Sequence, residues 1–165
     1  MARAYIGLGS NLARPIAQLR QARDALNRLP GSTLDAISGC YRNPPLGPPD
    51  QPDYVNAVAR LITDLAPLEL LDHLQAIERA QGRTRAGPRW GARTLDLDLL
   101  LYDDRVINEA RLVVPHPGIA ERAFVLWPLA EIAPPGLRIG SLGRLAELLR
   151  NVPRDSLIRV EDEQE

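Results

Sequence analysis

The chain has 165 residues, 45% of them hydrophobic, and a formal net charge of −1. It is therefore large enough for one domain with a buried core, and its charge does not indicate a nucleic-acid or membrane surface. We expect a cytoplasmic protein, because no apolar run matches a membrane span or a signal peptide and the single cysteine, Cys40, excludes a disulfide framework. All twenty basic residues are arginine, which excludes P-loop ATPases and protein kinases because both need a lysine beside the phosphates.

Apolar periodicity predicts five elements in the first half of the chain. In order, these are a strand over 3–9, a helix over 15–29, a strand over 34–41, a strand over 54–63 and a helix over 67–81 capped by Gly82. Glycines end the first strand, but Leu12 fills the third glycine position of a dinucleotide-binding motif. We interpret Gly7 and Gly9 as allowing either a tight strand-to-helix turn or close approach of a ligand to the backbone.

The segments around the third strand and the second helix carry candidate binding residues. Residues 42–52 contain five prolines, so this loop is either a semi-rigid lid over a site or a stiff connection. Tyr54 and Asn56 share one face of the next strand and can line a pocket for a flat heterocycle. Gln75 and Glu78 lie three positions apart on the predicted helix, where they act together on a ligand or form solvated surface.

Two acidic residues on one strand give the strongest functional signal. From Leu95 onward leucines alternate with Asp96 and Asp98, so both carboxylates share a face, with their Cα atoms about 7 Å apart. The apolar run 99–101 predicts a strand that is covered on both faces, which leaves the acids partly buried at its end. Such a pair can bind a divalent cation, whereas solvated acids on an edge strand are the alternative.

An arginine-rich loop precedes this acidic strand. It contains Arg83, Arg85, Arg89 and Arg93, with Trp90 among them. Guanidinium groups beside metal-binding acids are typical of a site for a magnesium-bound polyphosphate. The acids and the arginines together therefore predict magnesium-dependent phosphate chemistry.

The last third of the chain adds short strands and helices. A polar turn over 103–105 precedes the segments 106–107 and 111–117. We expect helices over 121–132 (interrupted at Pro128) and 141–150, a short strand over 157–160 and a frayed end over 161–165. His116 lies between two prolines in extended backbone, as a phosphate or nucleotide contact, a general base or an ordinary loop residue. The element order predicts one α+β domain with a ferredoxin-like antiparallel sheet, which the extra C-terminal helices turn into three α/β/α layers.

Five sequence blocks carry a resemblance to a known family. They are AYIGLGSNL over 4–12, DQPDYVNA over 50–57, RWGARTLDLD over 89–98, VPHP over 114–117 and PLAEIAP over 128–134. Through these blocks the chain resembles the 6-hydroxymethyl-7,8-dihydropterin pyrophosphokinases of folate biosynthesis. The resemblance implies transfer of the terminal pyrophosphoryl group of ATP to the pterin hydroxymethyl group, with release of AMP.

The resemblance also implies roles for individual residues. Asp96 and Asp98 are expected to hold two Mg²⁺ ions on the triphosphate, and Arg83 and Arg93 to act on the phosphates as further catalytic residues. The positions that match the nucleotide site are Gln75, Glu78, Arg85, Arg89, Trp90, Arg111, His116 and Arg122. The positions that match the pterin site are Asn43, Pro44, Leu46, Tyr54, Asn56, Trp90 and Phe124, where aromatic rings can stack on the pterin.

Two other functions fit the predicted fold. A ferredoxin-like sheet can bind RNA, but such sheets need stacking aromatic residues and this chain has 4% of them, with one Phe. A two-metal nuclease is also able to use the acidic pair. The resemblance implies instead ATP and the hydroxymethyl-dihydropterin as partners. We expect no nucleic-acid or membrane partner from the composition, and a monomer is the default expectation. The family commonly has Thr at the position of Asn43 and Pro at that of Ala92.

Overall fold

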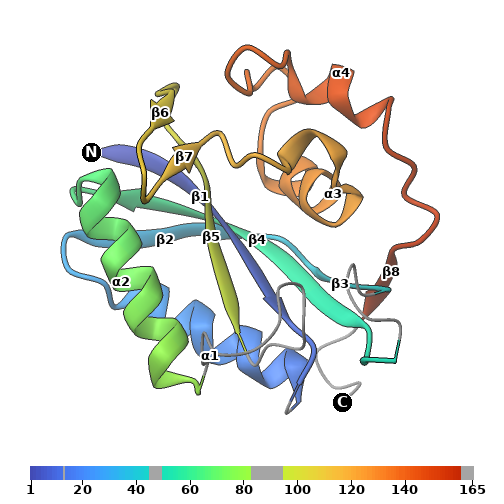
Figure 1. Cartoon of the computed structure of the whole chain (residues 1–165), viewed down its shortest axis with the longest axis horizontal. Coiled ribbons are helices and arrows are strands. Elements are labelled where there is room, and N and C mark those ends of the chain that lie inside the picture. The colour runs from blue at the N-terminus through green and yellow to red at the C-terminus, as the bar shows by residue number, and fades with distance from the viewer. Residues whose placement is uncertain (13, 45–49, 83–94, 161–165) are drawn as a thin grey trace.

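The computed structural model describes residues 1–12, 14–44, 50–82 and 95–160, and an antiparallel sheet runs through its centre (Figure 1). The strands of this sheet are β1 (Ala2–Ser10), β2 (Ser32–Ile37), β3 (Cys40–Asn43), β4 (Tyr54–Thr63), β5 (Asp96–Tyr102) and β8 (Ile158–Val160). Their order is β5-β1-β4-β3-β8, and β2 also pairs with β4. Each of these pairings is antiparallel, which confirms the predicted α+β class.

Helices pack against the sheet from two sides (Figure 1). They are α1 (Pro15–Asn27), α2 (Pro67–Ala80), α3 (Ala123–Ile132) and α4 (Leu145–Leu149). Ile16 of α1 and Leu74 of α2 share one hydrophobic core with Ile6 of β1. A second core joins Leu126 of α3 to Leu100 of β5. None of the helices among the described residues is long and apolar enough to cross a membrane.

The strand β5 separates leucines from acids as its alternation predicts. Leu97 and Leu99 are buried in the core with α1 and α2, so Asp96 and Asp98 lie on the opposite face, where both are half-buried. A shift in the β1–β5 register between Tyr5 and Ile6 accommodates the buried run over 99–101. β5 is an edge strand, but its acids are not fully solvated, so that alternative is wrong.

The predicted strand over 34–41 is in fact two strands, because a side chain interrupts it. The Ser38 hydroxyl accepts the N–H of Val58 at 2.9 Å and donates to the carbonyl of Gly39 at 2.8 Å. It thereby replaces a backbone acceptor for β4 at the break between β2 and β3, both of which pair with β4. The N–H of Gly39 donates instead to Glu131 Oε1 of α3, at 2.9 Å.

The C-terminal third departs most from the sequence prediction. A 3-10 turn (Ile119–Glu121) precedes α3, and α3 continues through the buried Pro128 without the predicted interruption. The predicted helix over 141–150 shortens to α4, because Gly140 and Gly143 adopt positive φ and turn the chain before it. Two short strands, β6 (Ile107–Asn108) and β7 (Val113–Val114), pair with each other beside the main sheet. The acidic end over 161–165 lies outside the described residues.

A buried carboxylate ties α2 to β5. Glu78, in the last turn of α2, is 2% exposed, and its Oε2 accepts the N–H of Leu97 at 2.8 Å. Leu97 lies between the two acids of β5, and β5 pairs only with β1 in the described sheet. Glu78 therefore bonds the open edge of the strand that carries the acids, so the solvated-surface interpretation of this residue is wrong.

We expect Glu78→Ala to lower the free energy of unfolding by about 2 kcal/mol, because the buried N–H of Leu97 loses its acceptor. Urea denaturation followed by circular dichroism measures the change. The matched control is Glu69→Ala, which removes an exposed carboxylate of the same helix that accepts the N–H of Ala66 at 3.0 Å. The control should cost less than about 1 kcal/mol, and equal losses in both variants would contradict the role of burial.

Candidate active site

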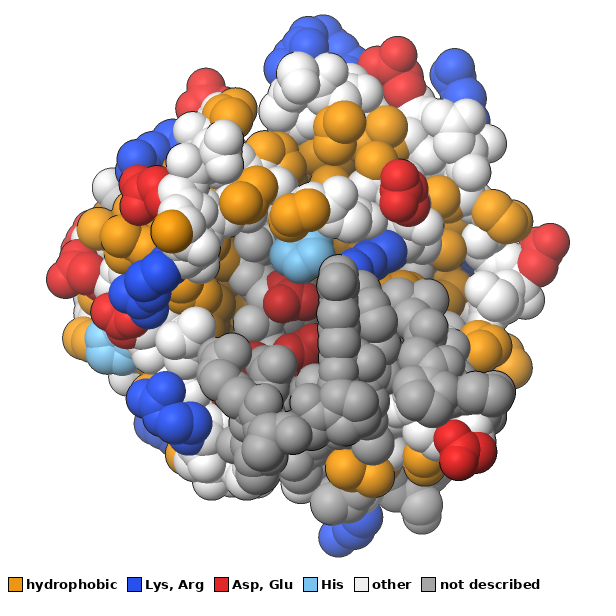
Figure 2. Space-filling model, viewed as in Figure 1, with side chains coloured by type: hydrophobic (Ala, Val, Ile, Leu, Met, Phe, Trp, Pro, Cys, Tyr) orange, Lys and Arg blue, Asp and Glu red, His pale blue; other side chains and the backbone are white. Residues whose placement is uncertain are grey.

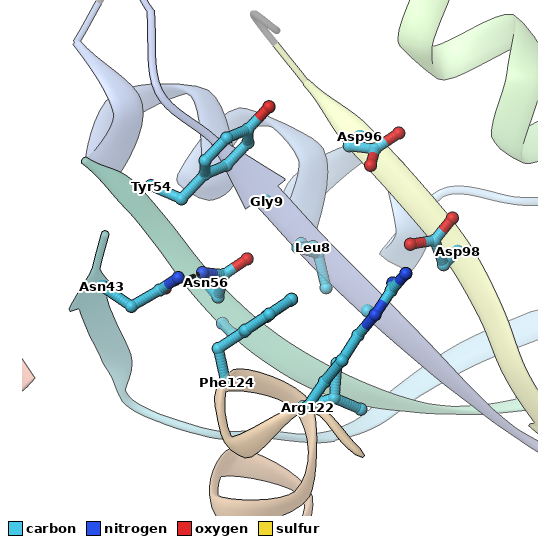
Figure 3. A pocket seen from close by; sticks show the side chains of 12 residues that line it. Leu8, Gly9, Asn43, Tyr54, Asn56, Asp96, Asp98, Arg122 and Phe124 are labelled. Carbon is cyan, nitrogen blue, oxygen red and sulfur yellow. Dashed lines mark hydrogen bonds between the residues drawn. The ribbon is translucent and has the colours of Figure 1, made fainter. Parts of the chain in front are cut away.

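A cavity lies on the α3 side of the sheet, where β1, β4 and β5 end (Figure 3). Asp96 and Asp98 border it from β5, Asn56 from β4 and Phe124 from the start of α3. Figure 3 shows the Asn56 side chain between the rings of Tyr54 and Phe124. Flat rings beside an amide suit a planar polar ligand.

Glycines form the floor of this cavity. Gly9 pairs with Asp96 on one side and with Asn56 on the other, and Gly7 pairs with Asp98. Paired residues of antiparallel strands share a face, so a Cβ at Gly9 would project between the acid and the amide, 2.8 Å from Asn56 Oδ1. The absence of side chains keeps this space open, which fits the close-approach interpretation. The tight-turn interpretation is wrong, because both glycines lie within β1.

The helix α3 is fixed to the sheet at its far end. Arg60 of β4 donates through Nη1 to the carbonyl of Ile132 at 2.8 Å. Glu131 accepts the hydroxyl of Tyr41 and the N–H of Gly39 from the β3 region. These contacts hold α3 in place, so its first turn keeps Phe124 over the cavity.

Positive charge faces the acidic pair from the residue before α3. Arg122 points across the cavity toward Asp98 (Figure 3), and its Cζ lies 5.8 Å from the centroid of the Phe124 ring. A Cβ at Gly118 would come within 2.5 Å of Arg122 Nε. The missing side chain at Gly118 thus leaves room for the guanidinium group.

His116 borders Asp98 from the other side. Its Nε2 lies 3.9 Å from Asp98 Oδ2, and its Nδ1 accepts the N–H of Gly118 at 3.2 Å. Burial, and next the positive charge of Arg122, hold the pKa of His116 below its ordinary value, although Asp96 acts in the opposite direction. The ring is therefore neutral at pH 7 with its hydrogen on Nε2. It presents a donor, which argues against the general-base interpretation.

A second cavity lies beyond Asp98. Its wall combines leucines with Asp98, Arg111 and His116, and Arg111 Nη2 lies 2.5 Å from Asp72 Oδ1 of α2. Asp98 therefore borders both cavities. Figure 2 shows acidic, histidine and basic side chains gathered in a hollow at the centre of this face of the molecule.

The acidic pair has the composition of a common magnesium site. The described part of the chain contains no group of three or more His, Cys, Asp or Glu side chains arranged to hold a metal ion. Mg²⁺ is commonly bound by one or two protein carboxylates, with ligand phosphates and water completing its octahedron. Two half-buried carboxylates on one face match this pattern better than they match a site in which the protein supplies all the ligands.

The structure separates the predicted site residues into three groups. Those that line one or both cavities are Asn43, Tyr54, Asn56, Asp96, Asp98, Arg111, His116, Arg122 and Phe124. Those that line neither of these two cavities are Pro44, which is exposed, Gln75, which is half-buried on α2, and Glu78. Those outside the described residues are Leu46, Arg83, Arg85, Arg89, Trp90 and Arg93.

Sequence reasoning missed two features of the site. The first is the spacing role of Gly118 beside Arg122, for which the sequence contains no local signal. The second is the hydrogen bond between the side chains of Asn43 and Asn56. These residues are thirteen positions apart in the sequence and meet because their strands are neighbours in the sheet. The polar residues at alternate positions of 54–56 did signal the β4 side of this pair.

Comparison with known proteins agrees with this geometry. Residues 5–134 match the family model of 7,8-dihydro-6-hydroxymethylpterin-pyrophosphokinase (HPPK). The 2-amino-4-hydroxy-6-hydroxymethyldihydropteridine pyrophosphokinase of Pseudomonas aeruginosa is 52% identical over 158 residues, 96% of each chain. The enzyme with the same name from Haemophilus influenzae is 54% identical over 133 residues, 81% of this chain and 82% of its own.

A solved structure shares the fold. The crystal structure of Plasmodium falciparum HPPK-DHPS with SDX-DHP matches with a TM-score of 0.72 at 14% identity. The match covers 96% of this chain and 47% of that chain, so this chain spans about half the length of that protein. At this identity the likeness shows the fold alone. From the family model and the two relatives it follows that this chain belongs to the 7,8-dihydro-6-hydroxymethylpterin-pyrophosphokinase family.

Proposed function

We propose that this chain transfers the pyrophosphoryl group of ATP to the hydroxymethyl group of 6-hydroxymethyl-7,8-dihydropterin, in folate biosynthesis. The observation that carries the proposal is the position of Asp98, which borders two cavities of different character. A carboxylate at the border of both cavities can help to position a chemical group while this group is transferred from a ligand in one cavity to a ligand in the other. Membership of the family supports this reaction.

The cavity floored by glycines is the proposed pterin pocket. A pterin ring is flat and conjugated, so it can stack on Phe124 and Tyr54. The amide of Asn56 offers hydrogen bonds to its edge. Asn43 lies in the same wall, where it bonds Asn56, and the remaining residues proposed to contact the pterin are Pro44, Leu46 and Trp90.

The second cavity is the proposed site of the nucleotide. Its leucines suit an apolar base, while Arg111 and His116 offer donors to the ribose and phosphates. Arg122 lies beside the acids, where it can meet the transferred group. The remaining residues proposed to contact ATP are Gln75, Glu78, Arg83, Arg85, Arg89, Trp90 and Arg93.

The chain's own groups orient the reactants and balance their charge. Asp96 and Asp98 would hold two Mg²⁺ ions, and these would supply positive charge to balance that of the phosphates. The pterin hydroxyl attacks the β-phosphorus of ATP in line. The bond from that phosphorus to the oxygen between the α- and β-phosphates breaks, and AMP leaves with this oxygen. No dedicated general base is required, and Asp96 is the residue proposed to be able to accept the hydroxyl proton. Arg83 and Arg93 are proposed to stabilise the transferred phosphates alongside Arg122.

We also assign the whole chain to one domain with a ferredoxin-like sheet between helical layers. The order β5-β1-β4-β3 supports this assignment, since it sets β1, the first strand, between β4 and β5, as a ferredoxin-like sheet sets its first strand between its third and fourth. The same arrangement weakens the RNA-binding alternative. α3 packs on the face that carries the cavity, and α1 and α2 pack on the other, so the middle of the sheet is not free for a nucleic-acid strand.

Incubation of the protein with ATP, Mg²⁺ and 6-hydroxymethyl-7,8-dihydropterin tests the reaction. We expect AMP and the pterin diphosphate in equal amounts, measured by chromatography. The omission of either the pterin or Mg²⁺ should stop AMP formation. Release of ADP, or cleavage of nucleic acid without AMP, would reject the proposed function in favour of an ordinary kinase or a nuclease.

We expect Asp98→Asn to lower kcat at least about a hundredfold, because the cations lose a charged ligand at the border of the two cavities. Thermal unfolding should stay close to wild type, since 38% of the Asp98 side chain is exposed. Asp104→Asn, an exposed acid just after β5, is the matched control. Near-normal turnover in Asp98→Asn would show that this carboxylate is structural.

We expect Gly9→Ala to weaken pterin binding at least about tenfold, because the new methyl group meets Asn56 Oδ1 at 2.8 Å and a hydrogen bond is worth about a factor of ten. Calorimetry gives Kd for the pterin, and the Kd of a non-hydrolysable ATP analogue should hardly change. Gly7→Ala is the comparison, since its methyl group meets Leu100 at an ordinary 3.4 Å. If both variants bind the pterin like wild type, the glycine floor is not the pterin site.

A further inference from the structure

Two asparagine side chains meet in the wall of the glycine-floored cavity. Asn43 of β3 and Asn56 of β4 are diagonal neighbours on paired strands, since Asn43 pairs with Tyr54. They are 5% and 7% exposed. Asn56 Nδ2 donates to Asn43 Oδ1 (Figure 3), and Asn43 Nδ2 donates to the carbonyl of Pro44 at 3.0 Å.

The carbonyl of Pro44 sets the direction of this chain of hydrogen bonds. A carbonyl oxygen only accepts, so the end of the Asn43 amide that faces it has to be the nitrogen. The oxygen of Asn43 then faces Asn56. Because that oxygen also only accepts, Asn56 has to present its own nitrogen there, and its oxygen lies at the other end of the planar amide.

That oxygen faces the cavity. Asn56 Oδ1 points away from Asn43 (Figure 3), toward the space above Gly9, where an added Cβ would come within 2.8 Å of it. Among the described residues, none donates a hydrogen bond to this oxygen. The oxygen borders the open cavity, so a ligand that places an N–H against it gains a hydrogen bond.

We propose that Asn43 is a positioning residue, which fixes the amide of Asn56 so that the pocket presents an acceptor to the ring. Without Asn43 the Asn56 amide can turn by 180° and present its nitrogen instead. With Asn43 in place the turned amide would set two carbonyl oxygens against each other. Asn43 thereby selects flat heterocycles whose edge offers an N–H, as the pyrimidine edge of a pterin does. The inference rests on the proposed function for the identity of the ring.

A double-mutant cycle tests whether Asn43 acts through Asn56. Calorimetry gives Kd for 6-hydroxymethyl-7,8-dihydropterin with wild type, Asn43→Leu, Asn56→Leu and the double variant, each saturated with a non-hydrolysable ATP analogue and Mg²⁺. Leucine has a similar size and no hydrogen-bonding group.

We expect Asn43→Leu to raise Kd about tenfold, and Asn56→Leu at least as much. In the double variant Asn43→Leu should add nothing, because its effect passes through the side chain already removed. Losses that add would overturn the proposal.

Two further measurements separate positioning from misfolding. Asn43→Leu should raise the KM for the pterin while kcat at saturation and the Kd of the ATP analogue stay near wild type. A loss of all three would mean a structural role and would overturn the proposal. Asn27→Leu is the matched control, because it removes an exposed amide that accepts the N–H of Leu34 at 3.0 Å at the end of α1.

The outcomes for wild type and variant bear on different claims. A wild-type protein that does not bind the pterin would reject the proposed function itself. A wild-type protein that binds it, beside an Asn43→Leu variant with the same Kd, would overturn only the role of Asn43. In the expected case, the side-chain amide signals of Asn56 in the ¹⁵N NMR spectrum also shift on Asn43→Leu, because the nitrogen loses its acceptor.

Discussion

The site depends first on the pairing register of β1 with β5. This register sets Gly9 beside Asp96 and Gly7 beside Asp98, and it is held from the far face, where Ile6, Leu97 and other apolar residues are buried. A slip of one residue would turn every side chain of a strand to the opposite face. Full burial of each leucine is worth about 1.5–3 kcal/mol, so burial of the leucines fixes where the carboxylates stand.

The acidic pair is held from both sides of its strand. β1 pairs with β5 on one side, and Glu78 bonds the N–H of Leu97 on the open side. The proposed cation site needs its ligands fixed to within a fraction of an ångström. An edge strand is ordinarily the least constrained part of a sheet, so the carboxylate of α2 supplies the restraint that a neighbouring strand would otherwise give.

Much of this fold follows from local sequence patterns. The strand over 54–63 has the predicted bounds, and β5 shows the predicted division between leucines and acids, because each pattern reports burial on one face. Features that depend on contacts with residues distant in the sequence could not be predicted from local patterns. The hydroxyl of Ser38 splits a predicted strand through its bond to β4, and Pro128 stays buried inside α3.

The same distinction applies to the site. The residues that line the cavities could be predicted one by one, but their mutual arrangement depends on which strands are neighbours. The space above Gly9 and the direction of the Asn56 amide are set by cross-strand contacts that no local pattern contains. Part of the expected phosphate site, including Arg83 and Arg93, lies outside the described residues and stays a prediction.

The attachment of α3 by Arg60 and Glu131 has a consequence for how the pocket can change over evolution. Because the C-terminal end of α3 is attached to the sheet, its N-terminal end, which carries Phe124, has little freedom to move. A tilt of α3 would break the hydrogen bonds at Ile132 and Gly39. A smaller residue in place of Phe124 would then make room for a bulkier ligand ring more readily than a movement of α3 would. Where related proteins bind ligands with rings of different size, we therefore expect their sequence differences in this pocket to concentrate at the position of Phe124.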